Sequence, residues 1–202
     1  MIWSHAFSIC LSAENMLKYY QEKIGSSSRQ KRKRGGTSHE KENDRSSTGM
    51  PCLRGYRSAV EQAGGTVLEV QYCDAQPGRA AAAMEVVMQK YPQGVDAVLV
   101  TSDDMALAAI KCIWDNNSDA YRKTVICGFD GNQAAVEALD RGELTVDIAQ
   151  QGYEMGYKAV EAALDALEGK SVESVIDSGS EVITADNIDA YIADCREKGL
   201  WS

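Results

Sequence analysis

The feature of the sequence that most constrains the fold is a series of three short apolar runs separated by segments of helical length. The runs are Asp96–Thr101, Thr124–Phe129 and Leu144–Ala149, and polar residues follow each of them. Buried strands that alternate with helices are typical of a parallel sheet covered on both faces. The pattern therefore predicts an α/β fold with a three-layer, doubly wound and mostly parallel sheet.

The polar residues that follow the three runs form the candidate binding site. Ser102 and Asp103 follow the first run, Asp130 follows the second and Gln150 follows the third. The carboxyl ends of parallel strands meet at one edge of the sheet, where such folds bind small molecules. A carboxylate can accept hydrogen bonds from two neighbouring hydroxyls, and an amide can both donate and accept. We therefore expect these side chains to share one rim that binds a sugar.

Each candidate residue also has a structural interpretation. Ser102, Asp103 or Asp104 could cap the helix that follows them, Asp130 could cap the next helix, and Gln150 could be a solvent-facing amide. The three acids also suggest an oxygen-ligand metal site, and hence a metal-dependent phosphatase-like enzyme, although no phosphate-binding glycine loop accompanies them. The residues alone leave these alternatives open.

The remaining motifs argue against an enzyme. Both histidines, His5 and His39, lie N-terminal to the α/β pattern, which excludes a histidine general base within that pattern. The sequence contains no G-x-S-x-G, H-E-x-x-H or phosphate-loop motif. We therefore expect no catalytic residue, no bound metal and no cofactor.

The N-terminal quarter differs in composition from the rest. Ser26–Gly49 contains no Val, Ile, Leu, Met or aromatic residue, which predicts disorder. Within it, Arg29–Arg45 carries seven Lys or Arg and three Asp or Glu, whereas the whole chain has a net charge of −9. The basic run is interpreted as a solvated segment, with a nuclear-targeting or nucleic-acid patch as the alternative. The acidic total argues against a nucleic-acid partner.

Several further features bound the class of protein. No apolar run approaches the ~20 residues that a membrane helix needs, and Met1–Leu11 does not support a signal peptide. The six cysteines include no C-x-x-C pair, so we expect reduced packing residues rather than a disulfide framework. Alternation predicts another strand at Thr66–Tyr72 and extended pieces at Val172–Ile176 and Glu181–Ile183. Periodicity and flanking Gly or Pro predict helices at Ser12–Ile24, Leu53–Gly64, Gly78–Tyr91, Met105–Trp114, Gln133–Asp140, Gly152–Glu168 and Asn187–Lys198.

Four stretches resemble successive landmarks of the periplasmic sugar-binding proteins, with the ribose-binding branch closest. They are VLVTSDDMAL at Val98–Leu107, VICGFDG at Val125–Gly131, IAQ at Ile148–Gln150 and ITADNIDAY at Ile183–Tyr191. Together they are specific for the superfamily, which also includes the effector domains of lactose-repressor-type regulators. The resemblance extends roughly from Leu53 to Tyr191.

The resemblance implies a two-lobed protein that closes over a monosaccharide and delivers it to an ABC transporter permease, in the periplasm or cell envelope. Asp130 and Gln150 would contact the sugar, and Ser102 would stand where the family usually has an Asn. Arg54 lies close to the position of an expected Arg, and Asp103 completes the candidate ligand set. The alternative is the effector-binding domain of a lactose-repressor-type transcriptional regulator.

The same resemblance divides the chain into a remnant helix of the first lobe (1–25), a disordered basic linker (26–50), one intact α/β lobe (51–150), and a crossover helix with hinge strands and a C-terminal helix (151–202). On this division most of the first lobe would be missing, and residues 152–176 would lack the sheet they normally cover. One hypothesis is that residues 26–49 are an out-of-frame translation of a once ordinary sequence. We expect such a truncated binder to be impaired in binding.

Overall fold

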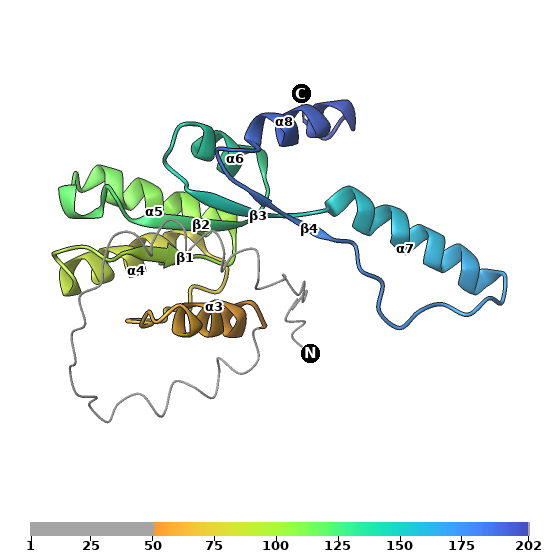
Figure 1. Ribbon diagram of the computed structural model, residues 1–202, viewed down its shortest axis with the longest axis horizontal. Coiled ribbons are helices and arrows are strands. Elements are labelled where there is room, and N and C mark those ends of the chain that lie inside the picture. The colour runs from red at the N-terminus through yellow and green to blue at the C-terminus, as the bar shows by residue number, and fades with distance from the viewer. Residues whose placement is uncertain (1–50, 202) are drawn as a thin grey trace.

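The computed structural model describes residues 51–201 of the chain (Figure 1). The predicted helix at Ser12–Ile24, the predicted disorder of Ser26–Gly49 and its basic run lie outside the described residues. No helix among residues 51–201 has both the length and the apolar character needed to cross a membrane. The elements, in chain order, are α3 (Pro51–Gln62), α4 (Pro77–Lys90), β1 (Ala97–Leu99), α5 (Asp103–Asp115), the 3-10 helix η1 (Asp119–Tyr121), β2 (Val125–Asp130), α6 (Gln133–Asp140), β3 (Val146–Gln150), α7 (Gly152–Leu167), β4 (Ser180–Ile183) and α8 (Ile188–Glu197).

The sheet has four strands in the order β1-β2-β3-β4. β1 and β3 both pair with β2 in parallel, and β4 pairs with β3 in antiparallel orientation. The three apolar runs of the sequence are therefore three adjacent strands, as predicted, and the mostly parallel sheet is confirmed. The predicted extended piece at Glu181–Ile183 is confirmed as β4.

Helices cover both faces of the sheet, which gives the predicted three layers. On one face, Tyr56 of α3 packs with Phe129 of β2 and Ile148 of β3. On the other face, α4, α5, α6 and α8 enclose a larger apolar core whose fully buried members include Ala106 and Val136. Because both faces are covered, β2 and β3 are buried along nearly their whole length.

The cysteines agree with the packing interpretation. The five cysteines within residues 51–201 are thiols rather than halves of disulfides. Cys127 is fully buried in β2, and Cys112 is buried on α5. Burial raises the pKa of the Cys112 thiol, which keeps it protonated and unreactive.

The prediction of a strand at Thr66–Tyr72 is wrong. This segment belongs to no sheet, and it is tied to the end of α4 by side chains: the Tyr91 hydroxyl donates to the Leu68 carbonyl (3.3 Å), and Lys90 pairs with Glu69. An alternating pattern shows that a segment has two different faces, but a strand also needs a partner that continues its ladder. None lies beside it among the described residues. Val172–Ile176 likewise forms no strand.

Helix α7 extends away from the sheet (Figure 1), and none of its residues is buried. Its apolar stripe includes Tyr153, Tyr157, Val160 and Leu164, whose exposed fractions are 50–61%. A helix with one apolar face usually buries that face. Within residues 51–201 this stripe packs against no other layer.

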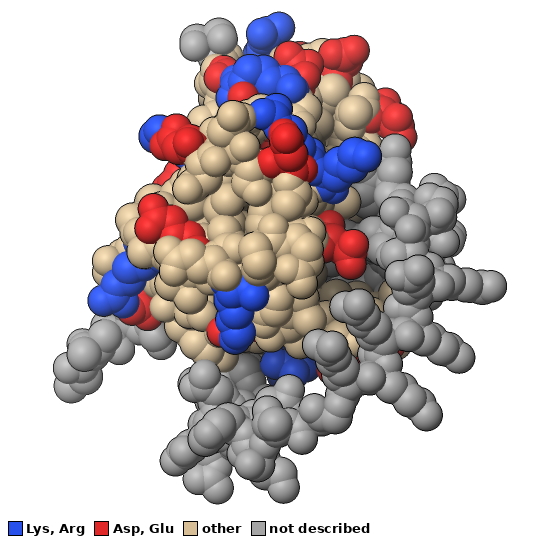
Figure 2. All heavy atoms as spheres, turned by 90° about the vertical axis from the view of Figure 1, so that its left-hand side faces the viewer, with Lys and Arg blue, Asp and Glu red and all other residues tan. Residues whose placement is uncertain are grey.

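The charged side chains of the described surface are mixed in sign. Figure 2 shows Lys and Arg interspersed with Asp and Glu rather than gathered into one patch on the face it displays. Several are short-range ion pairs, such as Lys111 with Asp115 and Arg122 with Asp119. Exposed pairs of this kind contribute about 0–1 kcal/mol each, so the fold depends on its apolar core.

Two leucines test which helices belong to that core. Leu139→Ala on α6 removes a side chain that is 3% exposed, and should lower the free energy of unfolding by about 2–5 kcal/mol. Leu164→Ala on α7 removes one that is 54% exposed, and should change it by less than about 0.5 kcal/mol. Urea unfolding of both variants measures the difference. Equal losses would show that α7 packs into the core in solution.

Candidate functional site: the strand-end rim

The carboxyl ends of β2 and β3 bring Asp130 and Gln150 into direct contact. Asp130 lies opposite Ala149 in the parallel register, so Gln150 follows one position further along β3. The Gln150 Nε2 atom donates a hydrogen bond to Asp130 Oδ1 at 2.5 Å. Both side chains are half-buried. The prediction that these two side chains lie close together at one edge of the sheet is therefore confirmed.

Ser102 lies at the same end of the sheet. It occupies the N-cap position of α5 in an extended conformation, but its hydroxyl makes no capping hydrogen bond to that helix. The backbone N–H of the next residue, Asp103, donates a hydrogen bond to the Asp130 carboxylate, and this bond favours the ionised form of Asp130. We call Ser102, Asp130 and Gln150 the strand-end rim. Its three polar side chains lie at or just after the carboxyl ends of the three adjacent strands β1, β2 and β3.

The backbone of the rim is strained at Asp130, whose φ is +129°. Residues other than glycine rarely adopt such a φ. The conformation costs about 1–3 kcal/mol and persists where the surrounding structure imposes it. Gly131 continues the turn with φ +79° and lies so close to β3 that a Cβ would stand 2.5 Å from the Ala149 Cβ. The Tyr191 hydroxyl donates to the Gly131 carbonyl at 3.3 Å. The turn thus packs closely against β3, and a hydrogen bond from Tyr191 of α8 stabilises it.

Asp103 is not placed among the ligand-facing side chains, contrary to the expectation from its neighbours in the sequence. It is fully buried, and both of its oxygens are occupied. Oδ1 accepts from the Phe129 amide at 2.8 Å, and Oδ2 accepts from the Asn132 amide at 2.9 Å. The first turn of α5 directs this carboxylate beneath the turn that follows β2. Asp103 therefore holds the residues on either side of Asp130.

Arg54 is also apart from the rim. It is exposed on α3, and no hydrogen bond or ion pair of the described residues joins it to Ser102, Asp130 or Gln150. Its neighbour Tyr56 faces the sheet instead and donates a hydrogen bond from its hydroxyl to the Val100 carbonyl at 3.3 Å. A ligand role for Arg54 stays a prediction that this arrangement does not support.

The electrostatics of Asp130 suit hydroxyl recognition. Burial raises the pKa of its carboxyl, and the negative charges of Asp103 and Asp104 add to that shift. The hydrogen bonds from Gln150 and from the Asp103 amide oppose it. A half-buried carboxylate that one amide already orients can still accept hydrogen bonds from a ligand's hydroxyls.

The acids of this region do not form a metal site. Residues 51–201 contain no group of three or more His, Cys, Asp or Glu side chains arranged to hold a metal ion. Asp103 is turned inward, whereas Asp104 is exposed. The arrangement therefore gives no support to the phosphatase-like alternative.

Sequence reasoning missed Asp147. It lies in the interior of β3, opposite Gly128, and is fully buried. The signal was available, because acidic residues are depleted in strands and rarely fully buried. An acid within the apolar run Leu144–Ala149 should have been singled out.

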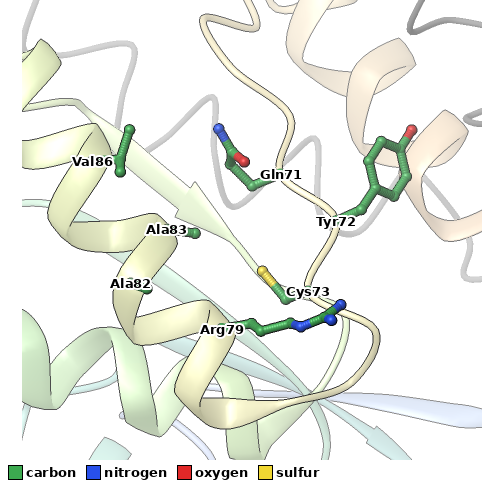
Figure 3. A pocket seen from close by; sticks show the side chains of 7 residues that line it. All are labelled: Gln71, Tyr72, Cys73, Arg79, Ala82, Ala83 and Val86. Atoms are coloured by element: carbon green, nitrogen blue, oxygen red, sulfur yellow. The ribbon is translucent and has the colours of Figure 1, made fainter.

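A hollow of the described surface lies away from the strand-end rim. Its volume is about 370 Å³. Figure 3 shows it between residues 71–73 and α4, with Cys73 and Arg79 at one end. Burial raises the pKa of the Cys73 thiol, so it is not an activated nucleophile. This hollow shares no residue with the strand-end rim. Its lining residues are Gln71, Tyr72, Cys73, Arg79, Ala82, Ala83 and Val86.

Comparison with known proteins gives consistent matches. Residues 10–171 match a family model described as the periplasmic binding protein domain. The ribose import binding protein RbsB of Bacillus subtilis (strain 168) is 37% identical over 93 residues, which make up 46% of this chain and 29% of that protein.

Solved structures match over a similar part. An ABC transporter solute-binding protein from Agrobacterium vitis with bound D-fucose has a TM-score of 0.64 at 26% identity, covering 71% of this chain and 49% of that one. A periplasmic ribose ABC transporter protein from Conexibacter woesei has a TM-score of 0.68 at 22% identity, covering 90% and 58%, and this likeness shows the fold alone. The chain thus matches less than a third of that curated relative and about half of these solved chains.

The close approach of Gly131 to β3 gives a test of the rim. Gly131→Ala introduces both an unfavourable φ and a collision with Ala149, and should cost about 3 kcal/mol or more of unfolding free energy. Gly142→Ala is the matched control, because Gly142 also has a positive φ (+73°) but open space around its Cβ position. It should cost only about 1–2 kcal/mol. Equal costs in urea unfolding would contradict the packed turn.

Proposed function

This chain belongs to the periplasmic binding protein domain family, and on that premise we propose that it is the sugar-contacting part of an ABC transporter's solute-binding protein. The observation that carries the proposal is the Asp130–Gln150 pair at the ends of β2 and β3. The names of the relatives support it, because they include a ribose import binding protein and a solute-binding protein with bound D-fucose. Its expected location is the periplasm or cell envelope, and its expected partner is the transporter's permease.

The rim offers the hydrogen-bonding pattern that a sugar needs. Asp130 accepts from one or two neighbouring hydroxyls, Gln150 orients it and can meet a further hydroxyl, and Ser102 adds a hydroxyl that can donate or accept. These groups bind and orient; none is a nucleophile paired with a base. We therefore propose a binding protein rather than an enzyme.

Transport is preferred over transcriptional regulation for a specific reason. The relative that is 37% identical is named for ribose import. An effector domain would share the fold and the rim, but it would act through a DNA-binding segment elsewhere in its chain.

The expected affinity of this chain alone is low. The rim supplies three or four hydrogen bonds, and each nets about 0.5–3 kcal/mol. Association costs about 4–15 kcal/mol, and the resemblance implies that the other half of the site comes from a first lobe. The balance is close to zero. We expect dissociation constants of about 1 mM or weaker for monosaccharides.

Titration of the ¹⁵N-labelled chain with ribose, fucose, glucose and galactose, followed by NMR, tests the proposal. Amide shifts should concentrate at Gly131 and Gln150, and Asp130→Asn should weaken binding by at least about tenfold, since a hydrogen bond to a charged group contributes about 1.5–3 kcal/mol. Asp140→Asn, at the exposed end of α6, is the matched control and should change nothing. Micromolar affinity would contradict the half-site, and sugar shifts that persist unchanged in Asp130→Asn would contradict the rim.

A further inference from the structure

Asp147 is a buried acid whose side chain has no hydrogen-bond partner among the described residues. Its exposed fraction is 0%, and both of its oxygens lack such a partner within residues 51–201. An ionised and unpaired carboxylate in such a place costs several kcal/mol, and proteins avoid it by neutralising the group or supplying a donor. Asp147 therefore requires an explanation that the rim itself does not provide.

The second carboxyl in this part of the core belongs to Asp103. Asp147 lies on β3 directly opposite Gly128 of β2. A Cβ on Gly128 would stand 2.6 Å from Asp103 Oδ1 and 3.4 Å from Asp147 Oδ1. The missing side chain of Gly128 therefore leaves the space in which the two carboxyls approach each other. Each carboxyl shifts the pKa of the other. Two ionised carboxylates have no donor between them, so a hydrogen bond can join this pair only when one of them carries a proton.

The hydrogen-bond partners decide which acid keeps the proton. Burial raises the pKa of the Asp103 carboxyl, but the hydrogen bonds that it accepts from the amides of Asn132 and Phe129 favour its ionised form. Around Asp147 only the Ile148 amide favours the ionised form, and neither carboxyl oxygen has a hydrogen-bond partner of comparable geometry among the described residues, so the proton belongs to Asp147. We propose that Asp147 is a positioning residue, whose protonated carboxyl donates a hydrogen bond to the Asp103 carboxylate and so fixes the Asp103 side chain beneath the turn that carries Asp130.

The surroundings of Asp147 favour the same assignment. Burial, followed by the charge of Asp103, raises its pKa to about 8. The other titratable groups that interact with it are Asp130 of β2 and Tyr191 of α8. Cys195 of α8 and Glu181 of β4 in turn interact with Tyr191. Lys198, which directly follows α8, is already paired with Asp194 at the surface. None of these groups supplies a positive charge to Asp147.

A dependence on pH follows. Because the folded pKa of Asp147 lies above its unfolded value of about 4, its contribution to stability is complete below about pH 4. That contribution is lost as the pH rises through about 8. Ionisation would place two charged carboxylates beside Gly128 and loosen the hold of Asp103 on Phe129 and Asn132.

The first experiment measures urea unfolding of the wild-type chain between pH 5 and 9. The unfolding equilibrium constant should rise by up to tenfold per pH unit until Asp147 ionises. Asp147→Asn keeps a donor for Asp103 but cannot titrate, and should flatten this profile, whereas Asp140→Asn should leave it as in the wild type. The same steep profile in Asp147→Asn would overturn the proposal.

The second experiment needs no stable variant at position 147. The carboxyl carbon of Asp147, followed by NMR in the folded wild-type chain, should titrate near pH 8, with concurrent shifts of the Phe129 and Asn132 amides. Asp103→Asn removes the neighbouring charge and should move this titration to lower pH. Titration of Asp147 near pH 4 in the wild type would overturn the pairing. Neither readout involves sugar, so the outcome is independent of the proposed binding function.

Discussion

The geometry of the strand-end rim depends on one buried interaction, the hold of the Asp103 carboxylate on the amides of Phe129 and Asn132. Those amides lie on either side of the turn that presents Asp130. Inside a protein, hydrogen bonds from amides to a carboxylate are about twice as strong as neutral ones, and an unsatisfied buried carboxylate is costly. The interaction therefore stabilises both partners: the carboxylate fixes the turn, and the amides of the turn satisfy the buried carboxylate.

This constraint explains the unusual backbone that follows β2. Asp130 adopts a φ of +129°, and Gly131 lies against Ala149 too closely for any side chain. A turn held only by local preference would relax away from that conformation. Here Asp103 holds it from α5 and Tyr191 from α8, so the strain persists at the residue that is best placed to meet a ligand. The proposed recognition by Asp130 therefore depends on Asp103 and Tyr191, which hold the turn from its buried side.

Much of the lobe could be predicted from sequence, because β1, β2 and β3 are buried runs between helices and their order along the chain is their order in the sheet. The neighbourhood of Asp130 and Gln150 followed from the geometry of parallel strands. The prediction of a strand at Thr66–Tyr72 was wrong because strand formation depends on a partner strand, which no local sequence pattern reveals. The sequence also did not predict the role of Asp103 or the presence of Asp147 beside it. The reason is similar, since Gly128 brings the two acids together only in the folded sheet.

Amide hydrogen exchange at the turn tests the central claim most directly. In the wild-type chain the Phe129 and Asn132 amides should be protected, and Asp103→Asn, whose side chain has only one acceptor oxygen, should accelerate exchange of at least one of them by about tenfold or more. The Val125 amide, which bonds to the Asp96 carbonyl at the far end of β2, should keep its exchange rate. Unchanged protection of both turn amides in Asp103→Asn would show that the turn holds its shape without the carboxylate and would contradict the account.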